Sequence, residues 1–262
     1  MSYQTLDIEI DPRGVAYVRL NLPDTRNALS AAMLEELTDM ARTLGAARST
    51  RAVVLSGHGK TFCAGGDLNW MQAQIEADRD TRMREARKLA EMLRALNEMP
   101  TPLIGRIHGG AFGGGVGLAC VCDLAVAASG TRFGLTETRL GLIPATIGPY
   151  VIARIGEGRA RRVFMSARLF EADEAEVLGV VARVVEAEAL DAAVEAEVAP
   201  YLSVAPGAVG AAKALARALG PRIDDAVIDD TIRRLADAWE DEEAAEGIAA
   251  FLGKRQPDWG QP

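Results

Sequence analysis

A glycine-rich stretch, IHGGAFGGGVGLACVCD at residues 107–123, has the clearest potential for chemistry in this sequence. Six of the nine residues from 109 to 117 are glycine, and small apolar residues follow them. Glycine lets a ligand approach the backbone closely, and a helix that begins here would present unpaired N–H groups. Such groups can bind a phosphate or stabilise an oxygen that gains negative charge during a reaction. The glycines could also simply allow a helix and a strand to pack closely.

The spacing of the glycines argues against a nucleotide phosphate loop. No G-x-G-x-x-G pattern occurs in residues 107–123. A second candidate, VVLSGHGKTF at residues 53–62, places Lys60 and a threonine after a predicted strand, but a P-loop requires glycine where Val54 stands. The sequence therefore favours a solvated loop around Lys60 and leaves nucleotide binding as the weakest alternative.

An oxyanion hole, in which backbone N–H groups stabilise a developing negative charge, explains the glycines better. Removing one such donor from an enzyme typically costs about 2.7–4 kcal/mol, and one donor is rarely enough. A second glycine-rich turn, FCAGGDL at residues 62–68, follows the predicted strand RAVVLSG at residues 51–57. The sequence therefore supplies two turns that can each contribute a donor.

These two turns and three further motifs make the chain similar to the enoyl-CoA hydratase/isomerase (crotonase) family. The motifs, in chain order, are RNALS at 26–30, FCAGGDL at 62–68, GGAFGGGVGLACVCDLAVA at 109–127, FGLTETRLGLIP at 133–144 and FLGKR at 251–255. Each is short, but their order matches the family over nearly the whole chain. Residues 140–162, LGLIPATIGPYVIARIGEGRARR, resemble the hydratases of methylglutaconyl-CoA and carboxygeranoyl-CoA most closely.

The resemblance implies three catalytic residues. The thioester carbonyl of an acyl-CoA would lie between the backbone N–H groups of Ala64 and Gly114, and Glu137 would serve as general acid and base. Hydratases of the family usually carry a further glutamate two residues beyond the triple glycine, where this sequence has Gly117. One carboxylate of the usual pair is therefore missing.

The resemblance implies hydration of the 2,3 double bond of an enoyl-CoA thioester, with an acyl chain that is branched or carboxylated. Two alternatives stay open because of Gly117. Family members that shift a double bond between positions 3 and 2 keep only the second glutamate, and a protein without catalysis could still bind acyl-CoA. Since CoA is part of the substrate, no separate cofactor is expected.

Residues that bind the CoA moiety are also carried over from the family. Asp67 could instead have an ordinary structural role, since it is placed to cap the following helix. Arg255 is a further candidate for the CoA phosphates but fits an amphipathic helical tail equally well. The expected CoA-binding residues are Arg26, Ala64, Gly66, Asp67, Leu68, Phe251 and Lys254.

No metal site and no serine hydrolase site are expected. The only histidines are His58 and His108, and Cys120 and Cys122 are spaced to point to different sides of a helix. The G-x-S-x-G pattern of a nucleophilic serine does not occur.

The elements that must position these residues can be read from the hydrophobic pattern. Residues 5–10 and 14–20 alternate around an Asp-Pro-Arg-Gly turn and predict a hairpin. Ser30 is placed to cap an amphipathic helix that Gly45 would end. The further strands expected are 51–57, 103–109 and 123–129, separated by helices, which predicts an α/β fold.

The resemblance implies that this fold is the crotonase spiral of β-β-α units, occupying residues 1–200. After about residue 155 the pattern is helical, with almost no strand signal. Residues 201–262 are expected to form a helical region that builds a homotrimer or a homohexamer.

Composition excludes two classes of partner. The net charge of −8 repels nucleic acid and anionic membranes. No apolar run approaches the roughly 20 residues of a membrane span, and no signal segment is recognised. Three cysteines, an odd number, indicate a reducing compartment, so a cytoplasmic location is expected.

Overall fold

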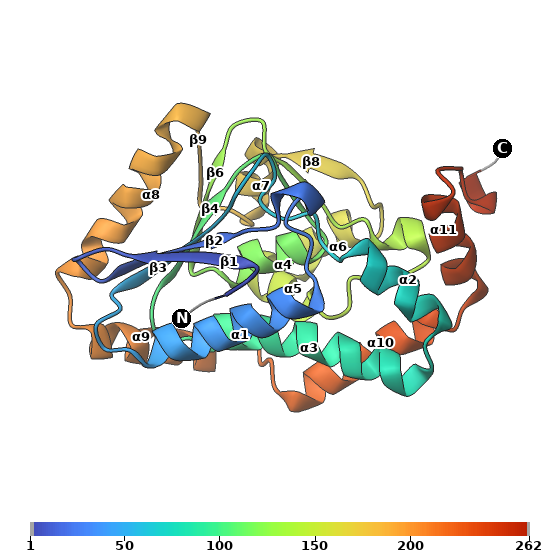
Figure 1. The fold of residues 1–262 in the computed structure, drawn as a ribbon, viewed down its shortest axis with the longest axis horizontal. Coiled ribbons are helices and arrows are strands. Elements are labelled where there is room, and N and C mark those ends of the chain that lie inside the picture. Colours follow the sequence, from blue (N-terminus) through green and yellow to red (C-terminus); the bar gives the residue numbers. More distant parts are fainter. Residues whose placement is uncertain (1–2, 261–262) are drawn as a thin grey trace.

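The computed structural model describes residues 3–260 and shows an α/β fold in which the regular elements after residue 185 are all helical (Figure 1). The α/β class expected from the sequence is confirmed. A six-stranded sheet has the order β1-β2-β3-β4-β6-β9, and a three-stranded sheet has the order β5-β7-β8. The strands are β1 (Leu6–Ile10), β2 (Val15–Leu20), β3 (Ala52–Gly57), β4 (Leu103–Ile107), β5 (Gly110–Phe112), β6 (Leu124–Ala128), β7 (Arg132–Gly134), β8 (Leu169–Glu171) and β9 (Arg183–Val185).

Helices lie on both faces of the larger sheet, and further helices pack beside them. They are α1 (Ala31–Ala46), α2 (Leu68–Glu76), α3 (Arg79–Glu98), α4 (Gly114–Val121), α5 (Gly148–Ile155), α6 (Glu157–Phe164), α7 (Ala172–Leu178), α8 (Leu190–Val198), α9 (Pro206–Leu219), α10 (Asp225–Trp239) and α11 (Glu242–Leu252). One of the short 3-10 turns, η2 (Glu137–Leu140), carries Glu137.

Strand β3 shows why the central strands read as continuous apolar runs. It pairs in parallel with β2 and with β4, so both of its edges are hydrogen-bonded. Val53 and Leu55 belong to the core cluster shared with α1, whereas Ala52 and Val54 belong to the cluster shared with α8. A parallel strand that is buried on both faces needs apolar residues at every position.

The strand predictions hold where strands are long and fail where they are short. The β1–β2 hairpin is antiparallel, with Leu6 opposite Leu20, as expected from the alternation. Strands β8 and β9 were not expected, since each has only three residues. Three residues are too few to show a period of two in the sequence.

Helix α1 begins as expected but does not end at Gly45. The Met33 N–H donates to Ser30 Oγ at 3.3 Å, which caps the first turn. The helix continues to Ala46. A β-carbon on Gly45 would lie 2.8 Å from Met99 Cγ, so this glycine allows close packing instead of ending the helix.

The C-terminal helices dock on the core in different ways. Helix α10 lies along α3, where Arg79 pairs with Asp237 at 2.6 Å and Arg94 pairs with Asp225 at 2.5 Å. Helix α11 packs on η2, while no residue of α9 is fully buried. The oligomerisation role expected for residues 201–262 stays a prediction.

Candidate functional site

The two glycine-rich turns lie side by side. The Cys63 N–H donates to Gly110 O at 3.1 Å, and the Phe112 N–H donates to Cys63 O at 3.0 Å. Gly65, with φ +91°, adopts a backbone conformation that favours glycine. A β-carbon on Gly65 would lie 2.8 Å from Phe112 O and 3.7 Å from Gly114 N. Glycine is therefore required here because the two backbones are in contact.

Helix α4 directs its first N–H groups toward this contact. Its N-cap, Gly113, has φ +47°, and its carbonyl accepts from Val116 N–H at 2.9 Å and from Gly117 N–H at 3.2 Å. The N–H of Gly114, the first residue of the helix, meets no hydrogen-bond acceptor within residues 3–260. Every residue of α4 is buried, as its small apolar sequence predicts.

The structure corrects the choice of the second backbone donor. The Ala64 N–H already donates to Arg26 O at 3.0 Å, so this group is not free to bind a substrate oxygen. Two residues later, the N–H of Gly66 has no acceptor among the described residues, and a β-carbon on Gly66 would have no atom within 4 Å. The Leu29 N–H donates to Gly65 O at 2.8 Å and fixes this peptide. Gly66 and Gly114 are therefore the candidate donors.

Glu137 lies beside the same helix terminus. A β-carbon on Gly113 would lie 3.0 Å from Glu137 Oε1. The residue is half-buried as a whole, but its Oε2 atom is shielded from solvent and has no hydrogen-bond partner within residues 3–260. Burial raises the pKa of the Glu137 carboxyl from 4.5 to about 7, and only its own backbone N–H opposes this shift. A carboxyl with such a pKa can both accept and return a proton near neutral pH.

A second carboxylate has no room at position 117. A β-carbon on Gly117 would lie 2.7 Å from Ile147 Cγ2 and 3.6 Å from Leu93 Cδ2. Ile147 is 2% exposed, so it cannot turn outward into solvent without opening the core. No local pattern in the sequence showed that Ile147, thirty residues away, fills this place. Apolar side chains thus occupy the place where the second catalytic carboxylate would lie.

Asp67 acts as the predicted cap of α2. The Trp70 N–H donates to Asp67 Oδ1 at 3.0 Å. Leu68 is the first residue of the helix, and its side chain lies outside the described part of the chain. Arg26 is exposed and has φ +55°. Its backbone carbonyl accepts the hydrogen bond from Ala64 N–H.

Asn27 is a buried residue that organises this loop, and the sequence reasoning missed it. Its Oδ1 accepts from Leu22 N–H at 2.9 Å, while its Nδ2 donates to His58 O at 2.9 Å and to Thr61 O at 2.8 Å. The amide therefore connects the 22–27 loop to the segment that leads into the first glycine turn. Its position after Arg26 in the RNALS motif was the available signal.

Phe251 and Lys254 lie on a different element, at the end of α11. Phe251 is 51% exposed, and Lys254 has φ +51° in the turn that follows the helix. No hydrogen bond or ion pair of the described residues joins them to Arg26 or to the glycine turns. Their role in CoA binding stays a prediction.

The loop around Lys60 does not have the geometry of a phosphate loop. The Phe62 N–H donates to His108 O at 3.0 Å, so the chain after Lys60 extends along the second glycine segment instead of entering a helix. A β-carbon on Gly109 would lie 1.8 Å from Lys60 O, which shows how tightly this loop is packed. Within residues 3–260, no cluster of His, Cys, Asp or Glu could hold a metal ion.

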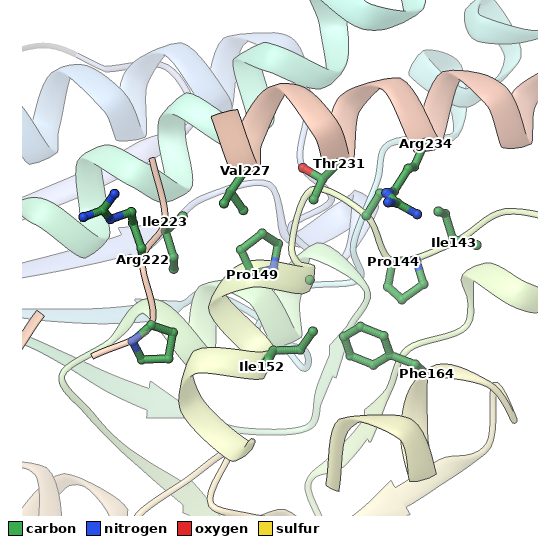
Figure 2. Close-up of a pocket in the computed structure, with 13 residues that line it drawn as sticks. Ile143, Pro144, Pro149, Ile152, Phe164, Arg222, Ile223, Val227, Thr231 and Arg234 are labelled. Atoms are coloured by element: carbon green, nitrogen blue, oxygen red, sulfur yellow. The ribbon is translucent and has the colours of Figure 1, made fainter. Parts of the chain in front are cut away.

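A separate cavity of about 370 Å³ lies between α5 and α10 (Figure 2). Pro149 and Ile152 of α5 face Val227 and Thr231 of α10 across it. Its lining does not include Glu137 or either glycine turn. The backbone donors and the carboxyl therefore define the candidate site, and the size of this cavity does not.

Among the described residues, no helix combines the length and the apolar character that a membrane span requires.

Comparison with known proteins identifies the family and the fold. The sequence model of the family described as "Enoyl-CoA hydratase/isomerase" matches residues 11–262. A Rhizobium meliloti protein named "Probable enoyl-CoA hydratase" is 34% identical, with 99% of both chains covered. The solved structure of an enoyl-CoA hydratase from Shewanella pealeana is 35% identical with a TM-score of 0.80, covering 98% of this chain and 96% of that one. Pseudomonas aeruginosa AtuE is 39% identical with a TM-score of 0.81, covering 98% of this chain and 100% of that one. The expected crotonase-like fold is thereby confirmed.

Proposed function

Because this chain belongs to the enoyl-CoA hydratase/isomerase family, we propose that it adds water across the 2,3 double bond of an enoyl-CoA thioester. The observation that carries this proposal is the buried carboxyl of Glu137 beside the N-terminus of α4, whose Oε2 has no hydrogen-bond partner among the described residues. A carboxyl in such a place is costly to the fold, since burial disfavours its charged form. Functional sites are where such costs are commonly found.

In the proposed reaction, the thioester oxygen accepts hydrogen bonds from Gly66 N–H and Gly114 N–H. Both groups are unpaired among the described residues, and each belongs to a backbone held in place by the contact between the two turns. Donors that are already oriented stabilise a developing enolate oxygen without reorganisation, by about 2.7–4 kcal/mol each.

Glu137 handles both proton transfers. As the oxygen of water bonds to C3, its proton passes to the carboxylate, and the electrons of the double bond move through C2 to the thioester oxygen. The carboxyl then returns the proton to C2, the thioester carbonyl re-forms, and the 3-hydroxyacyl thioester is complete. A pKa of about 7 allows the same group to act as base and then as acid.

The acyl chain that we propose is branched or carboxylated, on the basis of residues 140–162. Turnover of crotonyl-CoA and of methylglutaconyl-CoA, followed through the loss of the enoyl-thioester absorbance, tests both the reaction and this preference. Faster turnover of crotonyl-CoA would contradict the preference. No turnover of any enoyl-CoA in a panel of chain lengths would contradict hydration.

Isomerisation of a 3-enoyl-CoA to a 2-enoyl-CoA is the second candidate, and one observation favours it. Ile147 and Leu93 present hydrocarbon where a second, water-holding carboxylate would lie. A single carboxyl suffices to move a proton between two carbons of an enolate. Formation of the 2-enoyl product from a 3-enoyl substrate, without incorporation of ¹⁸O from labelled water, would identify this reaction.

A protein that only binds acyl-CoA is the third outcome of the same assays. Glu137→Gln is the matched variant, because the amide keeps the size of the carboxyl but cannot accept a proton as a base. We expect it to lose turnover while it retains acyl-CoA binding measured by calorimetry. Binding without turnover in both proteins would leave only the binding role.

We propose that the protein assembles as a homotrimer or a homohexamer. Leu215 and Leu219 on α9 are 61% and 81% exposed, and a second copy of the chain would cover them. Sedimentation velocity tests this, since a monomer would have the 27.8 kDa mass of the single chain.

A cytoplasmic location is also proposed, because Cys63, Cys120 and Cys122 are all free thiols.

A further inference from the structure

Helix α11 approaches the turn that carries Glu137 at backbone-to-backbone distance. A β-carbon on Gly247 would lie 2.5 Å from Leu140 C and 2.8 Å from Leu140 O. From the other side, a β-carbon on Gly141 would lie 2.3 Å from Glu243 C. Gly141 also has φ +67°, a conformation that favours glycine. Neither glycine can carry a side chain unless the two backbones separate.

This contact bears on the short 3-10 turn η2, whose first residue is Glu137. The Leu142 N–H donates to Glu137 O at 3.1 Å, and the N–H of Gly141 also points to this carbonyl. Leu142 is buried in a cluster with Ile248 of α11. A displacement of residues 140–142 is therefore transmitted directly to the backbone of Glu137.

The Glu137 side chain has little else to hold it. Among the described residues its Oε2 has no hydrogen-bond partner, and its own backbone N–H is the one donor to its carboxyl. A side chain held by a network would stay in place if its backbone moved slightly. Here the position of the carboxyl depends on the backbone of η2 and on the burial that surrounds it.

Glu246, the residue before Gly247, joins α11 to the turn that follows the helix. Glu246 Oε1 and Oε2 each accept from the Arg255 guanidinium at 2.6 Å, and Oε1 also accepts from Asp258 N–H at 2.9 Å. The Arg255 guanidinium lowers the pKa of Glu246 to about 2. Residues 246 and 247 thus attach the C-terminal turn and the Glu137 turn to one helix.

We propose that α11 is a positioning element for Glu137, and that Gly247 is the residue through which it acts. The proposal rests on the acyl-CoA chemistry assigned to Glu137 above. It makes the C-terminal helix part of the catalytic apparatus without contact between Gly247 and the substrate. The close approach at Gly247 keeps the carboxyl beside Gly113 and away from solvent.

Gly247→Ala is the direct test, because its methyl group would push α11 from η2. The variant should let water reach the carboxyl, so that the pKa of Glu137 moves toward its ordinary value by about one unit. We expect kcat to fall on the order of tenfold, with KM for the acyl-CoA changed less than about twofold. The pKa is measured by ¹³C NMR of glutamate-labelled protein, with Glu137→Gln identifying the resonance.

Two further variants keep the test decisive. Gly158→Ala adds the same methyl group to α6, where no atom lies within 4 Å, and should change neither the titration nor kcat. Ile248→Val removes one methylene from the same α11 contact. It should shift the pKa of Glu137 and kcat in the same direction as Gly247→Ala, but less. It also replaces Gly247→Ala if that variant does not fold.

The outcomes separate this proposal from the proposed function. A lower melting temperature with an unchanged Glu137 titration and unchanged kcat would mean that α11 only stabilises the fold, which would overturn the proposal. The titration needs no turnover. If wild-type protein hydrates and isomerises no enoyl-CoA, the proposed function fails, while the NMR result still decides whether α11 positions the carboxyl.

Discussion

The Glu137 carboxyl lies against Gly113, the N-cap residue of α4, so that a β-carbon at position 113 would stand 3.0 Å from Glu137 Oε1. This relationship places the Glu137 carboxyl beside the helix that offers Gly114 N–H. Burial is the main influence on the pKa of Glu137 and raises it to about 7, and no cation of the described residues opposes this. The proton carrier in η2 and one oxyanion donor in α4 thus lie close together at Gly113, although they come from different segments of the chain.

Removing the charge of Glu137 should stabilise the protein above neutral pH. Between about pH 4.5 and pH 7 the folded protein keeps a proton that the unfolded chain has released, so the free energy of unfolding falls as the pH rises through this window. Glu137→Gln removes this loss. The free energy of unfolding of the variant should exceed that of wild type by up to about 3 kcal/mol at pH 8 and by little at pH 4.5.

Urea unfolding of both proteins at the two pH values measures this difference. Glu188→Gln, which replaces an exposed glutamate, is the control and should show no such change. Equal stabilities of wild type and Glu137→Gln at pH 8 would mean that the carboxyl is well solvated in the folded protein.

The pH dependence of turnover should report the same carboxyl. A base must be ionised before it takes a proton from water, so kcat/KM should rise about tenfold per pH unit below pH 7 and then level off. Initial rates from pH 5 to pH 9 at low substrate concentration give this profile. A profile that is flat from pH 5 upward would remove Glu137 from the role of base.

Two substitutions at Gly66 test whether its N–H donates to the substrate oxygen. Gly66→Pro deletes the N–H and should lower kcat by about 10²–10³. Gly66→Ala keeps the N–H, and its methyl group would have open space, so its kcat should stay close to that of wild type. Equal kcat values for the two variants would exclude Gly66 N–H as a donor.

Restoring a second carboxylate should require two substitutions. Gly117→Glu alone drives a side chain into Ile147, and overpacking of this kind costs about 1–3 kcal/mol. We expect that single variant to lose stability and gain no hydratase activity. Gly117→Glu combined with Ile147→Gly vacates the space and should hydrate crotonyl-CoA faster than the single variant. A gain in activity from Gly117→Glu alone would show that Ile147 moves easily.

Lys254 should contribute to binding of the CoA nucleotide. Lys254→Ala removes an exposed ammonium group and should raise KM for the acyl-CoA on the order of tenfold, with kcat little changed. The same acyl group carried on pantetheine, which lacks the nucleotide, is the control substrate. An equal change in KM for both substrates would show that Lys254 does not contact the nucleotide.

The sequence alone determined the features that depend on neighbours along the chain. Ser30 and Asp67 cap the helices that follow them, because a cap bonds an N–H only three residues away. The β1–β2 hairpin and the buried helix α4 could be predicted for the same reason. Alternation of apolar and polar residues and a run of small apolar residues are both local patterns in the sequence. The order of the motifs added the family and the position of Glu137.

Only the tertiary structure decided what each site residue is free to do. Whether Ala64 or Gly66 offers its N–H depends on Arg26 O, a carbonyl from a distant loop. Whether Gly117 leaves a gap depends on Ile147, and the pKa of Glu137 depends on the burial that the whole fold provides. These properties arise from contacts between segments far apart in the chain, and a linear pattern contains no record of which atoms such contacts bring together.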